Sequence, residues 1–346
     1  MSNPPLLEVE GLTVEFETYG GVVKAVRGVD FTVEAGEVMA IVGESGCGKS
    51  VTVQSLMGII PMPPGRITAG SARLNGAELL GLEPRAANAF RGKEIGMIFQ
   101  DPMTSLNPTM TIGDQIAETL KVHRGIPGQQ AFESAIKLLE MTHIPEARKR
   151  ATQYPFEFSG GMLQRAMIAQ SLACSPSLLI ADEPTTALDV TIQAQLLDLT
   201  NTLQAQDAMA VILITHDLAV VARTAQKVCV MYAGQIIEHG SVDDIFYQSA
   251  HPYTLGLKSA MPSNIGDREK SLDPIPGSPP DLFSPPLGCG YAPRCPHAMR
   301  VCHEENPPFF KDSNNTGHAT RCWLQAPNAP SVPELYQSNK IASDGA

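Results

Sequence analysis

The stretch EVMAIVGESGCGKS, residues 37–50, decides the fold of this chain. Its apolar run from Val38 to Val42 predicts a buried strand, and GESGCGKS matches the G-x-x-x-x-G-K-S pattern of a phosphate-binding P-loop. Glycines let backbone N–H groups curl around phosphate oxygens, and the positive end of the following helix strengthens the attraction. A chance glycine-rich turn explains this order of strand, loop, lysine, serine and helix poorly. The stretch therefore predicts an α/β nucleotide-binding domain.

The P-loop divides into backbone donors and two side chains with separate tasks. Lys49 supplies a charge for the β- and γ-phosphates, and the Ser50 hydroxyl is expected to bind Mg²⁺. Cys47 has no base beside it in the sequence, and we assign its side chain no chemistry. The residues expected to contact the nucleotide are Gly43, Glu44, Ser45, Gly46, Cys47, Gly48, Lys49, Ser50 and Val51.

A second apolar run, SLLIADEP (residues 177–184), ends in two acids. A continuous apolar run is typical of a central parallel strand, and ligands bind at the carboxyl ends of such strands. Asp182 suits a water-mediated hold on Mg²⁺, and Glu183 is placed to polarise the water that attacks the γ-phosphate. Taken alone, the pair could equally cap a helix or sit on the surface. Beside a P-loop, the catalytic interpretation is favoured.

Two further polar residues follow apolar runs. His216 ends AVILITHD (residues 210–217), and Gln100 ends the run in MIFQDP. A histidine at a strand end is more often structural than catalytic, and a glutamine there often only begins a loop. With two other strands delivering polar groups to the same sheet edge, we expect both residues to serve the γ-phosphate region.

Composition limits the class of protein. The 346 residues are 43% hydrophobic and 18% charged, which indicates a soluble globular chain with room for one large and one smaller domain. The longest apolar stretches are too short to cross a bilayer, and the N-terminus lacks a basic region before an apolar block. A cytosolic chain is expected. The net charge of −11 argues against a general nucleic-acid binder.

Six motifs in one order resemble the ATP-binding cassette (ABC) ATPases over about residues 6–250: the P-loop, FQDP, SGG, LLIADEP, ALD and ITHD. The resemblance implies a RecA-like parallel-sheet core, an N-terminal antiparallel β part and a helical subdomain at about residues 101–165. It also implies that Gln100 is the Q-loop glutamine and a Mg²⁺ contact, that Asp189 belongs to the D-loop, and that His216 is the switch histidine. Apolar residues at helical spacing predict helices at 112–123 and 129–141, inside the helical subdomain.

The stretch FSGGM (residues 158–162) opens a helix-like segment but carries no acid, base or metal ligand. In ABC ATPases two cassettes pair head to tail, and each signature motif caps the ATP held by the other P-loop. The resemblance therefore implies that Ser159, Gly160 and Gly161 contact the nucleotide of a partner. Phe158 and Met162 depart from the commonest LSGGQ form.

The adenine of the nucleotide needs an aromatic stacking surface upstream of the P-loop. Phe16 and Tyr19 are the candidates, and Phe16 is preferred by its position in the family. Phe16 also continues an alternating strand pattern, so a role in the core stays open.

Beyond residue 250 the composition changes. HPYTLGLKSAMP (residues 251–262) resembles the segment that follows the cassette in ATPase subunits of bacterial oligopeptide and dipeptide importers, which implies an extension over residues 251–325. The proline-rich stretch 273–288 predicts a stiff linker or rigid loop. Residues 326–346 are polar and rich in Pro and Ala, and we expect disorder there.

Four cysteines, Cys289, Cys295, Cys302 and Cys322, fall in this extension with five, six and nineteen residues between them. A reducing cytosol disfavours disulfides. Zinc stays open as an alternative, although its ligands usually come in closely spaced pairs. The segment resembles the cysteine-containing tail of peptide-importer ATPases, some of which hold a 4Fe–4S cluster. We expect such a cluster with a structural role, and unliganded buried thiols are the third alternative.

Together these features predict the ATP-hydrolysing subunit of an ABC importer that takes up dipeptides or oligopeptides. The alternative is an ABC ATPase of DNA repair or translation, which usually carries two cassettes or a coiled-coil insertion. The importer resemblance implies these partners: a second, different ATPase subunit, two integral-membrane permease subunits, and a periplasmic or extracellular peptide-binding protein, with no nucleic acid. It places the chain peripherally, at the cytoplasmic face of the inner membrane.

Overall fold

The computed structural model describes residues 4–184, 208–260, 275–312 and 317–336. These residues divide between two compact units built from alternating segments of the chain. The first unit comprises Met1–Leu7, Val33–Val38 and Leu74–Ile214, and the second comprises Glu8–Thr32, Met39–Arg73 and Thr215–Ala346.

The first unit contains three parallel strands that carry the acidic motif. β6 (Ile95–Ile98) pairs with β7 (Leu178–Asp182), which pairs with β8 (Ala210–Ile214). Every residue of these strands is buried, as the continuous apolar runs predict for a parallel sheet covered on both faces. The register sets Asp182 opposite Ile214, so the acid lies at the carboxyl end of two adjacent strands.

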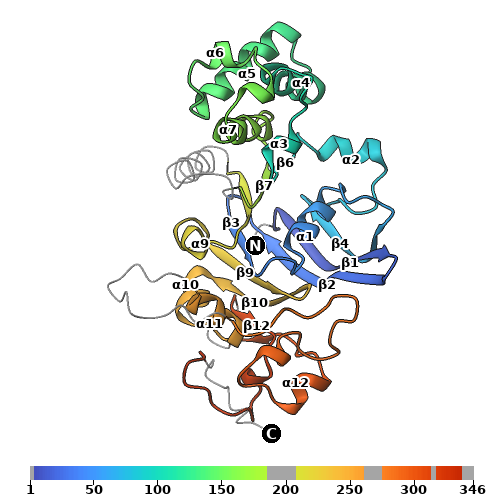
Figure 1. The fold of residues 1–346 in the computed structure, drawn as a ribbon, viewed down its shortest axis with the longest axis vertical. Coiled ribbons are helices and arrows are strands. Elements are labelled where there is room, and N and C mark those ends of the chain that lie inside the picture. The colour runs from blue at the N-terminus through green and yellow to red at the C-terminus, as the bar shows by residue number, and fades with distance from the viewer. Residues whose placement is uncertain (1–3, 185–207, 261–274, 313–316, 337–346) are drawn as a thin grey trace. The chain divides into compact units, whose positions relative to one another are not determined.

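Helices of the first unit gather in the region predicted as the helical subdomain, residues 101–165. Figure 1 shows α4, α5, α6 and α7 in one group. α4 (Ile112–Arg124) and α5 (Gly128–Met141) match the two predicted helices to within one residue at each end. Their shared apolar core continues to Cys174, beyond the expected boundary at 165. The remaining elements of this unit are β5 (Ala77–Glu78), α2 (Pro84–Phe90), α3 (Pro102–Ser105), α6 (Ala147–Arg150), η1 (Pro155–Glu157) and α7 (Gly160–Ser171).

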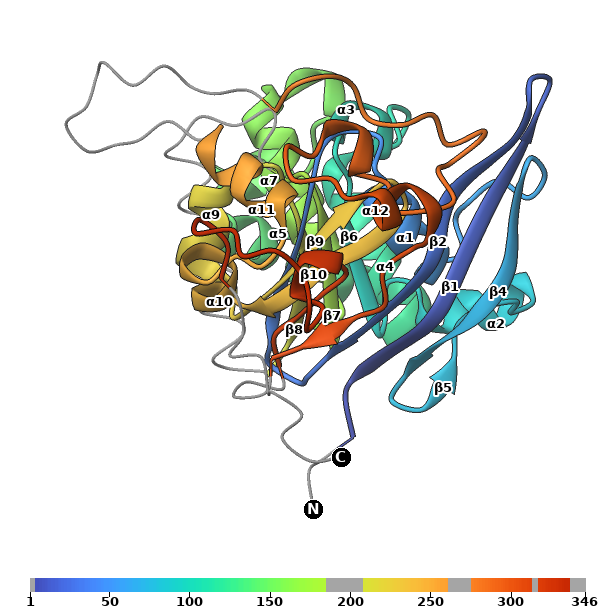
Figure 2. The ribbon, with the colours of Figure 1, turned by 90° about the horizontal axis from the view of Figure 1, so that it is seen from below.

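Three strands of the N-terminal β part lie in the second unit except for one end residue each (Leu7, Val33 and Leu74), and the short β5 lies in the first unit. β1 (Leu7–Thr18) lies between β2 (Gly21–Val33) and β4 (Gly65–Leu74). Figure 2 shows these long strands side by side. Alternating buried and more exposed residues along β1 indicate one face packed on the core.

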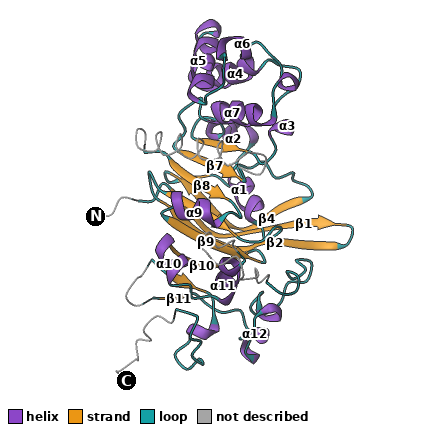
Figure 3. Ribbon diagram, turned by 60° about the vertical axis from the view of Figure 1, so that its left-hand side comes forward, coloured by secondary structure: helices purple, strands orange, loops and turns teal. Residues whose placement is uncertain are grey.

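The second unit also contains the strand that leads into the P-loop. β3 (Val38–Val42) pairs in parallel with β9 (Lys227–Tyr232), and β10 (Gln235–Ser241) continues the sheet antiparallel to β9. The C-terminal extension then adds two short antiparallel strands, β12 (Ala319–Thr320) on β10 and β11 (Phe310–Lys311) on β12. Figure 3 shows these strands with helices α10 and α11 beside them. The helices of this unit are α1 (Lys49–Leu56), α9 (Leu218–Thr224), α10 (Val242–Tyr247), α11 (Pro252–Ser259), η2 (Ala292–Arg294), α12 (Arg300–Glu304) and η3 (Trp323–Gln325).

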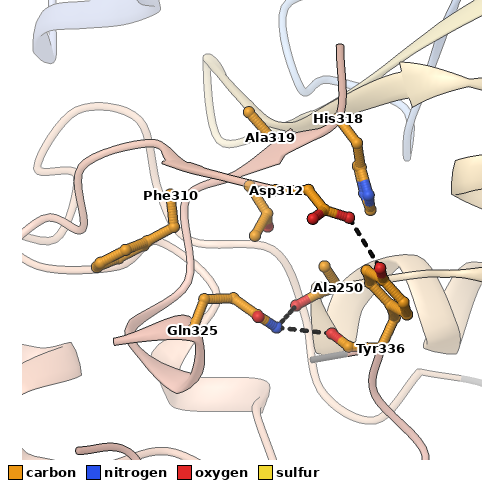
Figure 4. A pocket seen from close by; sticks show the side chains of 8 residues that line it. Ala250, Phe310, Asp312, His318, Ala319, Gln325 and Tyr336 are labelled. Carbon is orange, nitrogen blue, oxygen red and sulfur yellow. Dashed lines mark hydrogen bonds between the residues drawn. The ribbon is translucent and has the colours of Figure 1, made fainter. Parts of the chain in front are cut away.

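The end of the described chain is packed against this sheet. Gln325 Nε2 donates to the carbonyl oxygens of Ala250 and Tyr336, and Tyr336 Oη donates to Asp312, as Figure 4 shows. Val332 is buried beside them. The sequence predicted disorder from residue 326, whereas residues 326–336 are fixed by these contacts. Residues 337–346 lie outside the described residues.

In the described part of the chain, no helix combines the length and apolar character needed to cross a membrane.

Candidate functional site

The backbone between β3 and α1 follows a path open only to glycine at two points. Gly48 has a φ of 105°, and a Cβ placed there would lie 2.5 Å from the carbonyl oxygen of Ala25. A Cβ on Gly43 would lie 2.2 Å from the carbonyl oxygen of Met231. The loop is therefore pressed against the backbones of β2 and β9. α1 begins without a side-chain cap, which suits an anion at its first turn.

The Lys49 side chain forms hydrogen bonds to backbone carbonyl groups of this loop. Its side chain is nearly buried, and Nζ donates to the carbonyl oxygens of Gly43 at 2.8 Å and Glu44 at 3.0 Å. Cys47 Sγ lies 3.9 Å from the same ammonium. Burial raises the pKa of the Cys47 thiol, so this side chain is a neutral packing group.

Two residues of the C-terminal extension hold Glu44, and sequence reasoning missed both. Arg294 donates to the two carboxylate oxygens of Glu44 at 2.6 and 3.0 Å. The Glu44 backbone N–H donates to Tyr253 Oη at 2.9 Å. Glu44 and Arg294 are 250 positions apart, and no local pattern connects such distant residues.

The acidic end of β7 combines burial with a strained backbone. Asp182 is 3% exposed, and Glu183 follows it with a φ of 46°. The Glu183 backbone N–H donates to the carbonyl oxygen of Ile214 at 3.0 Å. A residue other than glycine held at positive φ is strained, and such strain clusters at functional sites.

The structure brings two of the predicted catalytic side chains together in the first unit. Gln100 Nε2 donates to Glu183 Oε2 at 3.2 Å. The turn after Glu183 is held by a further residue, Gln164 of α7, whose buried amide donates to the Pro184 carbonyl oxygen at 2.8 Å. Its sequence context, a glutamine within an ordinary helical pattern, gave no sign of this role.

In the motif after β8, one residue caps a helix and the other has an exposed side chain. Asp217 accepts hydrogen bonds from the backbone N–H groups of Ala219 and Val220, so it is the N-cap of α9. The His216 side chain is exposed. His216 and the carboxylates of β7 belong to different units, and its contact with the γ-phosphate stays a prediction.

α7 begins at the FSGGM motif with a side-chain cap. Ser159 Oγ accepts from the Met162 backbone N–H at 3.4 Å. Among the described residues, a Cβ on Gly160 would have no neighbour within 4 Å, and the φ of Gly160 lies outside the left-handed region. The motif's departures from the commonest form have a physical reason: Phe158 is buried in the helical core and Met162 packs against it.

The two adenine candidates differ in exposure. Tyr19 is fully exposed at the turn between β1 and β2. The ring of Phe16 lies 3.2 Å from the position that a Cβ on Gly65 would take, so this ring is partly packed. Exposure therefore favours Tyr19, the reverse of the sequence preference. Asp189 of the predicted D-loop lies outside the described residues.

The prediction of a 4Fe–4S cluster is wrong. Within residues 4–184, 208–260, 275–312 and 317–336, no group of three or more Cys, His, Asp or Glu side chains is placed to hold a metal ion, so the zinc alternative has no support either. Three of the four thiols fall into two different packing groups. Cys322 packs with Leu324, Val332 and Leu335, whereas Cys289 and Cys295 pack against a cluster of tyrosines.

Burial also favours the protonated form of three of these thiols, those of Cys289, Cys295 and Cys322. It raises the pKa of Cys295 to about 11 and also raises the pKa values of Cys289 and Cys322. Because the thiolate is the form that binds metals, a raised pKa disfavours ligation. Of the four, Cys302 and Cys322 are buried and Cys289 and Cys295 are half-buried, and no disulfide joins any of them in the described chain.

Comparisons with known proteins cover both the cassette and the extension. The family described as ABC transporter matches residues 26–186, and the family described as oligopeptide/dipeptide transporter, C-terminal region, matches residues 237–302. In Bacillus subtilis, the oligopeptide transport ATP-binding protein OppD is 54% identical over 335 residues, which are 96% of this chain and 93% of the relative. The dipeptide transport ATP-binding protein DppD of the same organism is 50% identical, over 92% of this chain and 95% of its own.

A solved structure shares the architecture of the cassette. It is a dimeric ATP-binding cassette in a post-hydrolysis state, bound to ADP and Pi. Its sequence is 25% identical, its TM-score is 0.62, and the match covers 68% of this chain and 98% of that one.

Proposed function

The chain belongs to the oligopeptide and dipeptide transport ATP-binding proteins of the ABC transporters, and we propose that it is one of two different cassettes in a peptide importer. It is an ATPase subunit that powers uptake of dipeptides or oligopeptides through separate transmembrane subunits. An ABC ATPase of DNA repair or translation is not favoured, because the similarity includes the C-terminal region of peptide transporters.

The observation that carries this function is the extent of the match. The relatives align over more than nine-tenths of this chain, including the extension that follows the cassette. A P-loop by itself would support nucleotide binding alone, whereas the extension is specific to the peptide-transport class.

On the P-loop side, we assign ATP binding to the backbone of residues 43–51 and to Lys49, whose charge meets the β- and γ-phosphates. Mg²⁺ prefers hydroxyl, amide and carboxylate oxygens, and Ser50, Gln100 and Asp182 supply all three. The near-complete burial of Asp182 fits a carboxylate that takes a cation partner. When bound, the ion supplies positive charge to the β- and γ-phosphate oxygens.

For hydrolysis, Glu183 is the residue that accepts the proton of the attacking water. Its strained backbone and its 3.2 Å hydrogen bond with Gln100 support this assignment, since both fix the carboxylate. Gln100 orients Glu183, and His216 contributes to the γ-phosphate. Tyr19 stacks on the adenine.

The signature segment acts on a partner's nucleotide. Among the described residues, nothing lies within 4 Å of a Cβ added to Gly160, so their packing does not require a glycine there. A close approach from another molecule supplies a reason for the glycine. The dimeric state of the solved cassette with ADP and Pi agrees with this arrangement. Asp189 is assigned to the same interface.

The other partners follow from the importer class: two permease subunits in the membrane and a peptide-binding protein on its outer side. The chain then acts peripherally, at the cytoplasmic face of the cell membrane. No nucleic-acid partner is required, and the net charge of −11 accords with that.

Glu183→Gln tests the assignment in the importer reconstituted in proteoliposomes. Peptide-stimulated hydrolysis at the site of this P-loop should fall by about 10²–10⁴-fold, the usual effect of removing a general base, while ATP binding is retained. Glu118→Gln, an exposed acid of α4, is the matched control and should leave both unchanged. Near-normal turnover in Glu183→Gln would remove Glu183 from the mechanism. Peptide uptake that does not depend on this subunit would reject the function.

A further inference from the structure

The guanidinium of Arg294 has all of its hydrogen-bonding capacity used. Its five N–H donors meet the two oxygens of Glu44, Tyr232 Oη at 3.1 Å, and the carbonyl oxygens of Pro276 at 2.8 Å and Ile275 at 3.3 Å. The side chain is only 5% exposed. A buried arginine with every donor satisfied is held in one orientation and presents a fixed fork to its carboxylate.

Glu44, a P-loop residue, is thereby held through three different groups. Its carboxylate binds Arg294, its backbone N–H donates to Tyr253 Oη, and its carbonyl oxygen accepts from Lys49 Nζ. Two of these three anchors come from residues beyond 250, and Tyr253 itself is fully buried. Through Glu44, the extension is therefore linked to Lys49, the lysine assigned to the phosphates.

The extension approaches the neighbourhood of this loop at other points as well. The Pro286 carbonyl oxygen accepts from Arg27 at 3.3 Å, and the Leu282 carbonyl oxygen accepts from the Lys24 backbone N–H at 2.9 Å. Both partners lie in β2, the strand against which Gly48 is pressed. The proline-rich segment thus contacts β2 at two points. Arg294, which binds Glu44, follows it in the chain.

Folding of the extension does not by itself require Glu44 as the partner. The Glu44 side chain is 27% exposed, so water could solvate much of its charge. What the ion pair adds is a fixed position for a loop whose function depends on several N–H groups pointing at one phosphate chain. Loss of such an anchor weakens the loop's hold on the nucleotide more than it weakens the fold.

We propose that Arg294 is a positioning residue for the phosphate-binding loop, so that the C-terminal extension sets the affinity of this subunit for ATP. The inference rests on the proposed function only in taking ATP as the ligand of the P-loop. Arg294 does not touch the nucleotide; it acts through Glu44.

The test compares Arg294→Met with Arg300→Met, which removes an exposed arginine of the same extension that pairs with Glu304. The probe is MgATP carrying a fluorescent ribose label, bound to the full-length chain. Arg294→Met should raise the Kd by roughly tenfold, the effect of losing one charge-assisted hydrogen-bonded contact, and Arg300→Met should leave it unchanged. In the assembled importer, KM for ATP should rise by a similar factor with little change in kcat.

A double-variant comparison separates positioning from general damage. If Arg294 acts through Glu44, Glu44→Gln weakens binding by itself, and adding Arg294→Met to it changes the Kd by less than about twofold. A lowered thermal midpoint with an unchanged Kd would mean a structural role only and would overturn the proposal. If Arg294→Met does not fold, Glu44→Gln decides: an unchanged Kd overturns the proposal and a weakened one supports it.

The outcome is distinguishable from failure of the proposed function. Wild-type chain that does not bind MgATP would reject the function itself. Wild-type chain that binds MgATP, together with an Arg294→Met chain that binds it equally well, would reject only the positioning role.

Discussion

Two helices of this molecule, α1 and α7, begin at glycines, and they do so for opposite reasons. At the start of α1, a Cβ on Gly48 would lie 2.5 Å from a backbone oxygen of its own chain, and the helix has no side-chain cap. At the start of α7, a Cβ on Gly160 would meet no atom of the described part of the chain within 4 Å, and Ser159 supplies a cap. The fold requires the glycine of the P-loop, whereas we propose that a partner's nucleotide requires the glycine of the signature segment.

The difference separates stability from function at the two sites. A change at the first glycine disturbs both the fold and the binding of ATP. A change at the second leaves the isolated chain intact and shows its effect only after assembly. The predictions below use this contrast.

Gly48→Ala should have the largest effect. The added methyl group collides with the Ala25 carbonyl oxygen, and a φ of 105° is strained for alanine. We expect the free energy of unfolding to fall by about 4 kcal/mol, from overpacking plus backbone strain, and nucleotide binding to become undetectable. Denaturant titration and a nucleotide-binding assay measure the two effects. Normal stability would show that this loop tolerates a side chain.

Ser159→Arg should act only on the assembled transporter. A long charged side chain at the start of α7 blocks close approach of a partner's nucleotide, so turnover should fall by roughly a hundredfold, as for a misplaced reacting group. Binding of ATP to the isolated chain should be unchanged. Gln129→Arg, which adds the same charge at an exposed position of α5, is the control. If the two cassettes still closed on ATP in the Ser159→Arg variant, the proposal that the start of α7 contacts a partner's nucleotide would be refuted.

A third helix start, that of α11, adds a dependence on pH that the serine cap of α7 lacks. His251 Nδ1 accepts from the Tyr253 backbone N–H at 3.0 Å, and burial lowers the pKa of His251 to about 3. An unfolded histidine titrates near 6.5, so below that pH the unfolded chain binds a proton that the folded chain refuses. Stability from this cap is complete above pH 6.5 and is lost as the pH falls toward 3.

Between pH 7 and pH 5, the free energy of unfolding of the His251→Asn variant should therefore fall by about 2 kcal/mol less than that of the wild type. His239, with a pKa lowered to about 4 by burial, adds a loss of the same sign in both proteins. His318, whose pKa is raised in its contact with Glu238, acts in the opposite sense, because its contribution is present at low pH and is lost as the pH rises. Chemical denaturation at each pH measures the difference, and parallel profiles would contradict the assignment.

Gly160→Ala should have the smallest effect. Stability of the isolated chain should stay the same or rise by less than about 1 kcal/mol, because alanine favours a helix more than glycine does. Turnover of the assembled importer should drop by roughly tenfold, since one methyl group displaces the partner's phosphate less than an arginine does. If Gly160→Ala lowered the stability of the isolated chain as clearly as it lowered the turnover of the assembled importer, the proposed difference between Gly160 and Gly48 would be wrong.

Local patterns predicted most of the fold. The apolar run at Val38–Val42 and the helical periodicity around α4 and α5 depend on neighbours a few residues away, and each element was found where it was predicted. The same holds for Asp182 and Glu183 at the end of β7, because a polar residue that follows a buried strand must emerge at the sheet edge.

Relations between distant residues could not be predicted. The spacing of four cysteines resembled a ligand set, but packing assigned Cys322 to one apolar cluster and Cys295 to another. The sequence favoured Phe16 over Tyr19 for the adenine, whereas in the structure Tyr19 is fully exposed and Phe16 is half-buried. The bond from Arg294 to Glu44 left no trace in either local sequence, because its geometry depends on the whole second unit.

The contact between Arg294 and Glu44 can form only late in the synthesis of the chain. Glu44 leaves the ribosome long before Arg294 exists, because 250 residues separate them. At about 5–20 residues per second, the P-loop waits roughly 12–50 s for its partner. A chain cut short anywhere in that interval carries the whole nucleotide motif without the arginine that positions it. Nascent and truncated copies would then bind ATP weakly, and strong binding would mark a chain that has been made almost to its end.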